Sequence, residues 1–252
     1  MEKCRFKGCT KEVFKNSFCE EHYGEIIASI KIDDDLTGRS AKKSKEDLSW
    51  LLYLQTICFK VGSMFGSVIN GYQKLFNVTV EDASFILEKR ADVLLRKGKY
   101  EGAASRYEKI IRYKADDPKV LYNLGCAYSK TGKFLNAGKC FEQSIKLDDK
   151  NKDAHFQLGL AHLREEKYQE AIDVLNKLIK LDPNHVGAHY RKGIALDKMK
   201  NYDGAIASFQ KAIAINPTIA KIYQSLGFSL ESKGEHSEAV KHFKKAIDLE
   251  EA

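Results

Sequence analysis

Small residues recur along this chain at a fixed interval of 34 positions. They are Ala91, Gly125, Gly159, Gly193 and Gly227. An alanine follows each of them twelve positions later, and a bulky apolar residue comes four positions after that alanine. An interval of this size indicates tandem supersecondary units that stack on one another, rather than one globular core. Because stacked units form extended surfaces, the interval favours a binding function.

Each unit has the pattern of two helices that cross closely at the small residue and the alanine, because a larger side chain would push the helix axes apart. Glycines suited to ending a helix lie between them at positions 98, 132 and 234. The pattern resembles the tetratricopeptide repeat (TPR) family in five consecutive units over residues 84–252. Repeat three departs from it at Glu166, which replaces the turn glycine, and at His162, which replaces an aromatic or aliphatic residue. We therefore predict an all-α fold, a right-handed TPR superhelix of five regular repeats.

Three further segments precede the repeats. Residues 1–23 bear cysteines, and residues 24–47 are polar and predict a flexible linker. Residues 48–80 predict a degenerate first TPR-like helical hairpin, strongly apolar over residues 48–76. That stretch is long enough to span a membrane, but Lys60 near its centre would cost about 3 kcal/mol in mid-bilayer, so a span is disfavoured. With no capping helix after repeat five, both ends of the array are expected to be adhesive.

The chain also resembles a narrower family, the magnetosome-associated TPR proteins (MamA), from about residue 48 to the end. The likeness rests on residues 50–53 and 76–78 of the degenerate unit, the turn at residues 60–64, the segment 124–132, and the last helix at residues 242–250. It implies a cytoplasmic scaffold, peripheral on the magnetosome membrane, that forms homo-oligomers and recruits other magnetosome or membrane-associated proteins. It further implies that the degenerate unit docks into a neighbour's concave groove. The self-assembly residues would be Trp50, Leu51, Leu54, Met64 and Phe65.

The amino-terminal segment has the spacing of a zinc site. Cys4, Cys9, Cys19 and His22 offer three thiolates and one imidazole, which suits a closed tetrahedral Zn²⁺ site of structural type. A unit of this length cannot fold on apolar burial alone, so the metal would supply its stability. The alternative is that these are unrelated cysteines in a disordered tail.

A groove for a peptide or protein is predicted on the first helices of the repeats. Its residues are Arg96, Tyr122, Asn123, Lys130, Phe156, Arg164, Tyr190, Arg191 and Lys198. A basic row beside aromatic rings suits an acidic peptide, since charge steers association and rings supply contact area. The alternative is a solvated helix edge with ordinary packing rings.

Other functions receive less support from the residues. The net charge of +7 falls within residues 84–252, but it is spread over every repeat without a nucleic-acid-binding motif, so no nucleic-acid partner is expected. No nucleophile–base pair or phosphate loop is visible, which argues against an enzyme. Histidines 155, 185 and 189 are expected to be packing residues rather than metal ligands. The rival to a self-assembling scaffold is a monomeric TPR adaptor that binds acidic peptides.

Overall fold

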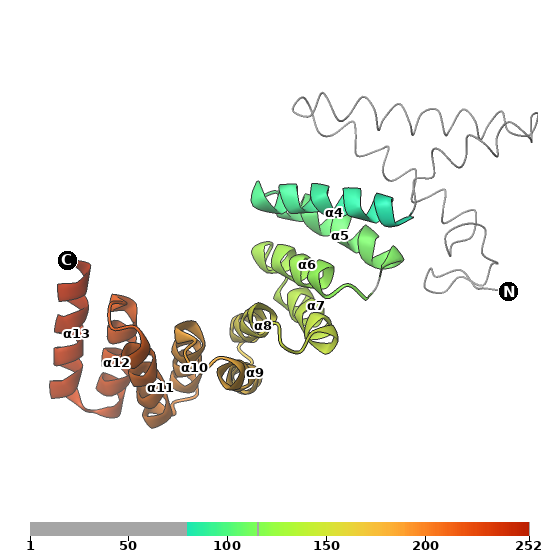
Figure 1. The fold of residues 1–252 in the computed structure, drawn as a ribbon. Coiled ribbons are helices and arrows are strands. Elements are labelled where there is room, and N and C mark those ends of the chain that lie inside the picture. The colour runs from blue at the N-terminus through green and yellow to red at the C-terminus, as the bar shows by residue number, and fades with distance from the viewer. Residues whose placement is uncertain (1–79, 115, 252) are drawn as a thin grey trace, which may run out of the picture. The chain divides into compact units, whose positions relative to one another are not determined.

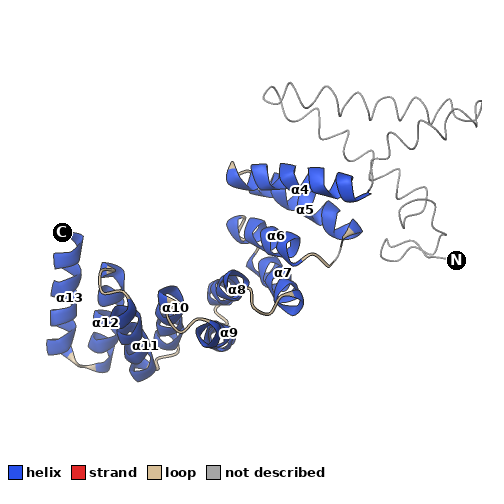
Figure 2. Ribbon diagram, viewed as in Figure 1, coloured by secondary structure: helices blue, strands red, loops and turns tan. Residues whose placement is uncertain are grey.

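A computed structural model describes residues 80–114 and 116–251, which form helices arranged in pairs (Figures 1 and 2). The ten helices of this part of the chain are α4 (Val80–Arg96), α5 (Tyr100–Tyr113), α6 (Pro118–Lys130), α7 (Phe134–Leu147), α8 (Lys152–Arg164), α9 (Tyr168–Leu181), α10 (Val186–Lys198), α11 (Tyr202–Ile215), α12 (Ala220–Lys233) and α13 (His236–Glu250). The all-α repeat array predicted from the sequence is therefore confirmed. The zinc segment, the linker and the degenerate hairpin lie outside the described residues, apart from Val80.

The chain divides into two compact units. One unit comprises residues 1–90 and 112–115, of which only the start of α4 and the end of α5 are described. The other comprises residues 91–111 and 116–252 and holds most of the helices. Within it, α6 to α13 pack in chain order, each helix against the next (Figure 1). The first helices of neighbouring repeats also touch, α6 with α8, α8 with α10, and α10 with α12.

The small residues make this close packing possible. A Cβ atom added at Gly193 would lie 2.5 Å from Cε1 of Phe209, and one added at Gly125 would lie 2.6 Å from Cε1 of Phe141. Both rings are almost completely buried, so they have no room to move aside. The partner of each of the four glycines at positions 125, 159, 193 and 227 is thus the bulky residue sixteen positions later, as the repeat pattern predicts.

Three of the first helices, α6, α8 and α10, begin at polar caps that recur at the 34-residue interval, whereas α12 begins at Ile219 without a side-chain cap. The side chain of Asp117 accepts hydrogen bonds from the backbone amides of Lys119 and Val120 at the start of α6. The side chain of Asn151 accepts one such hydrogen bond, from the backbone amide of Ala154, at the start of α8. Such a cap satisfies amide groups that have no partner within the helix. Capping and the proline at the first position of α6 fix where these helices start.

The turns inside the five repeats share one backbone conformation. Gly98, Gly132 and Gly234 have positive φ angles of 72°, 77° and 92°, and Glu166 and Lys200 have φ angles of 60° and 61° at the equivalent positions. A side chain in this left-handed region is strained by about 1–3 kcal/mol, whereas glycine adopts it freely. The repeats thus impose the turn on whichever residue occupies the position.

We expect the substitution Glu166→Gly to raise the free energy of unfolding by about 1 kcal/mol, because it relieves the strain of the positive φ angle. The gain is reduced by the extra freedom that glycine has in the unfolded chain. Chemical unfolding followed by circular dichroism measures it. Lys200→Gly should give a gain of the same sign, and Glu166→Ala, which keeps a Cβ at the strained position, should give none. Unfolding of Glu166→Gly at lower denaturant than the wild type would contradict the explanation.

Candidate protein-binding surface

The aromatic residues of the predicted groove lie in the packing between neighbouring helices. Tyr122 contacts the ring of Phe141 at a centroid distance of 5.8 Å, and Tyr190 contacts Phe209 at the same distance. Tyr190 is only 9% exposed, and its hydroxyl is hydrogen-bonded to Ser225 of the next repeat at 3.3 Å. Tyr190 therefore offers little surface to a ligand.

Phe156 keeps part of its surface exposed but has a structural partner as well. Its ring lies 4.9 Å from the imidazole of His185, and a Cβ at Gly187 would come within 3.1 Å of the ring. It packs on the buried cluster of Leu175, Leu178 and Ala188. Tyr122 and Phe156 are thus the two groove rings that combine packing with exposure.

The polar residues of the groove are partly engaged by neighbouring side chains. Asn123 donates from Nδ2 to Oδ1 of Asp92, 3.3 Å away, and the hydroxyl of Tyr107 donates to the same carboxylate oxygen. Arg191 lies over the ring of Tyr190, 5.4 Å from its centroid, in a cation–π arrangement. Asp92 was not singled out from the sequence, because its two partners come from other helices, 15 and 31 positions away.

The basic residues of the groove occupy one position in successive repeats. Arg96, Lys130, Arg164 and Lys198 are exposed, and each lies in the last turn of its helix. Cations there interact favourably with the carboxyl-terminal end of the helix dipole, which gives them a structural role. Among the described residues, Lys130, Arg164 and Lys198 form no salt bridge. Their charges are therefore available to an acidic ligand.

The two described cysteines are free thiols inside the repeats. Burial raises the pKa of Cys140 to about 11. Burial also raises the pKa of Cys126, against the opposing effect of its hydrogen bond with Tyr122. Burial and the neighbouring Cys126 in turn raise the pKa of Tyr122 above its usual value. Thiols with raised pKa values stay protonated at neutral pH and are weak nucleophiles, so these two act as packing residues.

The histidines considered as metal ligands have structural partners. His185 precedes α10 and caps it, with Nδ1 accepting from the amide of Ala188 at 3.0 Å. His189 contacts the carbonyl oxygen of Pro183 through Nε2, and His155 contacts that of Asp149. No group of three or more potential ligands is found within residues 80–114 and 116–251. In the same ranges, no helix combines the length and apolar character needed to cross a bilayer.

Comparison with known proteins places this geometry in a family. The family model of anaphase-promoting complex, cyclosome, subunit 3 matches residues 96–178 and 136–212, and a tetratricopeptide repeat model matches residues 220–252. No curated protein matches the chain. Among solved structures, a crystal structure of MamA protein is 33% identical, with a TM-score of 0.64, and the match covers 67% of this chain and 92% of that one. The chain belongs to the MamA family of tetratricopeptide-repeat proteins.

Two further MamA structures show the same relation. One is 34% identical with a TM-score of 0.62, and the match covers 64% of this chain and 94% of that one. The other, MamA 41-end from Desulfovibrio magneticus RS-1, is 28% identical with a TM-score of 0.64, and covers 67% of this chain and 95% of that one. Membership of the MamA family and the repeat architecture both indicate binding of protein partners.

Proposed function

We propose that this protein is a non-enzymatic TPR scaffold that self-assembles into large homo-oligomers on the cytoplasmic face of the magnetosome membrane. It would associate with that membrane peripherally and recruit other proteins for magnetosome assembly. The observation that carries the proposal is the likeness to MamA, which extends over 92% of the related chain. TPR arrays present surface rather than reactive groups, which agrees with a scaffold.

Self-assembly would depend on the apolar segment that precedes the described helices. Residues 48–80 of one copy, with Trp50, Leu51, Leu54, Met64 and Phe65, would dock in the concave groove of the next copy. An apolar segment of this size needs cover from another surface in water. Contacts between two different surfaces propagate from copy to copy and build rings or filaments.

Light scattering across a range of concentrations tests the assembly. The full chain should form large particles, and a chain shortened to residues 79–252, which keeps α4 to α13, should remain monomeric. A full chain that stays monomeric at high concentration would refute the proposal. Localisation of the tagged protein in cells that form magnetosomes tests the membrane assignment separately.

A monomeric adaptor is the second candidate, and the unpaired basic row favours it. Lys130, Arg164 and Lys198 carry three positive charges at equivalent places in successive repeats. Reversing the charges of Arg96, Lys130 and Arg164 to glutamate separates the candidates. If these changes abolish binding of a protein ligand without altering particle size, the adaptor is supported. If the variant still binds its ligand and still assembles, the basic residues have no role in either candidate function.

We further propose a structural zinc ion at Cys4, Cys9, Cys19 and His22. The full chain purified without chelator should contain about one zinc ion per molecule, as set by one four-ligand site. Cys9→Ser should abolish zinc binding, because three ligands no longer close the site. Cys140→Ser is the matched control, since this buried thiol lies in α7, and it should leave the zinc content unchanged. Equal zinc content in the two variants would contradict the assignment.

A further inference from the structure

The junction between α11 and α12 differs from the junctions earlier in the array. Residues 212–220 contain no charged residue, whereas the equivalent stretches 144–152 and 178–186 both contain lysine and aspartate. We call residues 212–220 the uncharged segment. Within it, Ile219 is 37% exposed, and Pro217 and Thr218 are exposed as well. Lys211 and Lys221 lie directly at its two ends, so the junction combines apolar surface with a cation on either side.

Ile219 occupies a position at which the earlier repeats have a helix cap. Asp117, Asn151 and His185 precede it at intervals of 34, and each accepts a hydrogen bond from the first turn of the helix that follows. Ile219 makes no side-chain cap for α12. Aliphatic residues are poor caps, so an isoleucine here lowers the stability of the helix. The requirements of folding therefore do not account for Ile219.

Asn216 makes the same turn as its equivalents, but without their charge. The side chains of Asp148 and Asp182 each accept a hydrogen bond from the backbone amide two positions later, and Asn216 accepts one from Thr218 in the same way at 3.0 Å. The hydroxyl of Thr218 donates to the same oxygen at 2.8 Å. The polar side chains of the segment thus satisfy each other, which reduces the cost of moving them out of water.

The two lysines at the ends of the uncharged segment are available to an external anion. Lys211 and Lys221 are exposed, and neither takes part in a salt bridge in the part of the chain that the structure describes. Exposed apolar groups beside cations are typical of surfaces that bind membranes peripherally. There the apolar groups enter the headgroup boundary while the cations attract anionic lipids.

Carboxylates at the end of α13 limit the size of such a contact. α13 ends beside the first half of α12, where Gln224 donates to Glu250 at 2.7 Å. Asp248 and Glu251 are close to Glu250 in the sequence. Because these carboxylates repel an anionic surface, only the uncharged segment and its two lysines can enter it. One molecule would therefore bind weakly, and several copies joined in one assembly would bind much more tightly.

We propose that the uncharged segment, with Lys211 and Lys221, docks on a bilayer that contains anionic lipids. Ile219 and Pro217 enter the boundary between headgroups and acyl chains, and the two lysines contact lipid phosphates. This contact rests on the proposed peripheral association of the protein with a membrane, for which it supplies the surface.

Flotation of the full chain with vesicles in a density gradient tests the contact, because assembled protein alone does not float. The chain should float with vesicles of equal parts phosphatidylglycerol and phosphatidylcholine, and at least severalfold less with phosphatidylcholine alone. Ile219→Asn should reduce flotation at least severalfold, because it removes the apolar group. The same substitution supplies the kind of cap that Asn151 provides for α8, so it should raise the midpoint of urea unfolding. Lost binding in a more stable variant cannot result from misfolding.

Leu135→Asn is the matched control, since Leu135 is 54% exposed at the start of α7, outside the uncharged segment, and it should leave flotation unchanged. Replacing Lys211 and Lys221 together by glutamine should lower flotation with the anionic vesicles severalfold. If Ile219→Asn floats like the wild type, the segment is not the contact, while peripheral association stands. A wild type that does not float overturns the lipid contact, and its localisation in cells then decides whether a protein partner holds it at the membrane.

Discussion

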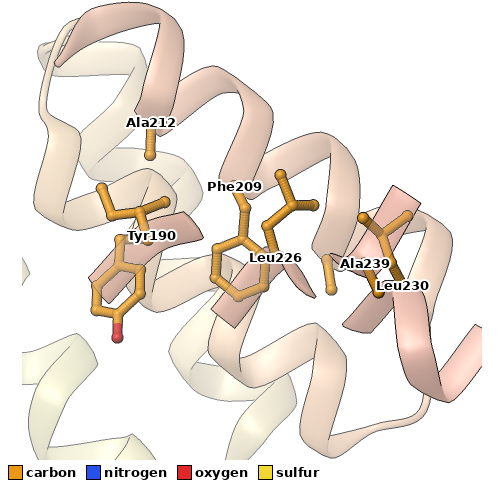
Figure 3. Close-up of a cluster of buried hydrophobic side chains, with 8 residues drawn as sticks. Tyr190, Phe209, Ala212, Leu226, Leu230 and Ala239 are labelled. Atoms are coloured by element: carbon orange, nitrogen blue, oxygen red, sulfur yellow. The ribbon is translucent and has the colours of Figure 1, made fainter. Parts of the chain in front are cut away.

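The substitution Gly193→Ala is expected to lower the free energy of unfolding by about 1–3 kcal/mol, the usual cost of overfilling a packed core. The added Cβ would lie 2.5 Å from Cε1 and 2.7 Å from Cδ1 of Phe209, distances that atoms in contact do not tolerate. Phe209 is 1% exposed and is flanked by Tyr190 and Leu226 (Figure 3), so its ring cannot turn away. The helices α10 and α11 must therefore separate.

Gly138→Ala is the matched control for this prediction. Gly138 is also buried in a helix, α7, but a Cβ there would meet only Cδ1 of Leu158 at 3.8 Å, an ordinary contact. Replacing a mid-helix glycine by alanine should raise the stability by about 0.5–1 kcal/mol. Urea unfolding of both variants measures the two effects. The two changes in the free energy of unfolding need not be equal in size. A Gly193→Ala variant as stable as Gly138→Ala would refute the steric explanation.

A graded response is expected along the array. At Gly159 the facing residue is the buried Leu175, and the added Cβ would lie 2.9 Å from its Cδ2 and 3.0 Å from its Cγ, farther than the ring atoms of Phe209 lie from a Cβ at Gly193. A leucine changes rotamer more easily than a ring shifts between two helices. Gly159→Ala should therefore cost less than Gly193→Ala.

The repeat pattern predicted these close approaches because both partners of each contact belong to the same repeat. Gly125, Gly193 and Gly227 each face the phenylalanine sixteen positions later, so one interval in the sequence identifies both partners. The turns are similar. Glycine at 98, 132 and 234 indicated a left-handed residue, and the structure shows that Glu166 and Lys200 adopt the same conformation. Lys200 was missed, although it lies 34 positions after Glu166 and 34 before Gly234, so the repeat interval alone identifies it as a turn position.

The groove was harder to predict because its residues have partners in the next repeat. The spacing placed Tyr122, Phe156 and Tyr190 at one position of successive helices, but not how much of each ring stays exposed. That depends on Ser225 beside Tyr190 and on His185 beside Phe156, which come from different helices. The role of His185 as a helix cap was likewise missed, because histidine is not among the residues preferred at that position.

Truncating Phe209 should have a larger effect than any substitution considered so far. We expect Phe209→Ala to lower the free energy of unfolding by about 3–5 kcal/mol, because it removes a buried ring and leaves a cavity. The ring joins α11 to Tyr190 of α10 and to the cluster that contains Leu226 of α12. In a repeat array, stability depends on the contacts between neighbouring units. The substitution should therefore destabilise the helices on both sides of α11, which are α10 and α12.

Phe243→Ala provides the comparison, because Phe243 faces Gly227 as Phe209 faces Gly193. Phe243 is only partly buried, and Phe228 beside it is largely exposed. Its truncation should cost less than half as much as that of Phe209. Hydrogen exchange should show faster opening of α10 to α12 in Phe209→Ala, and of α12 and α13 alone in Phe243→Ala. If the two variants lose equal stability under conditions where the chain is monomeric, the contribution of each ring to the free energy of unfolding does not depend on its position within the array.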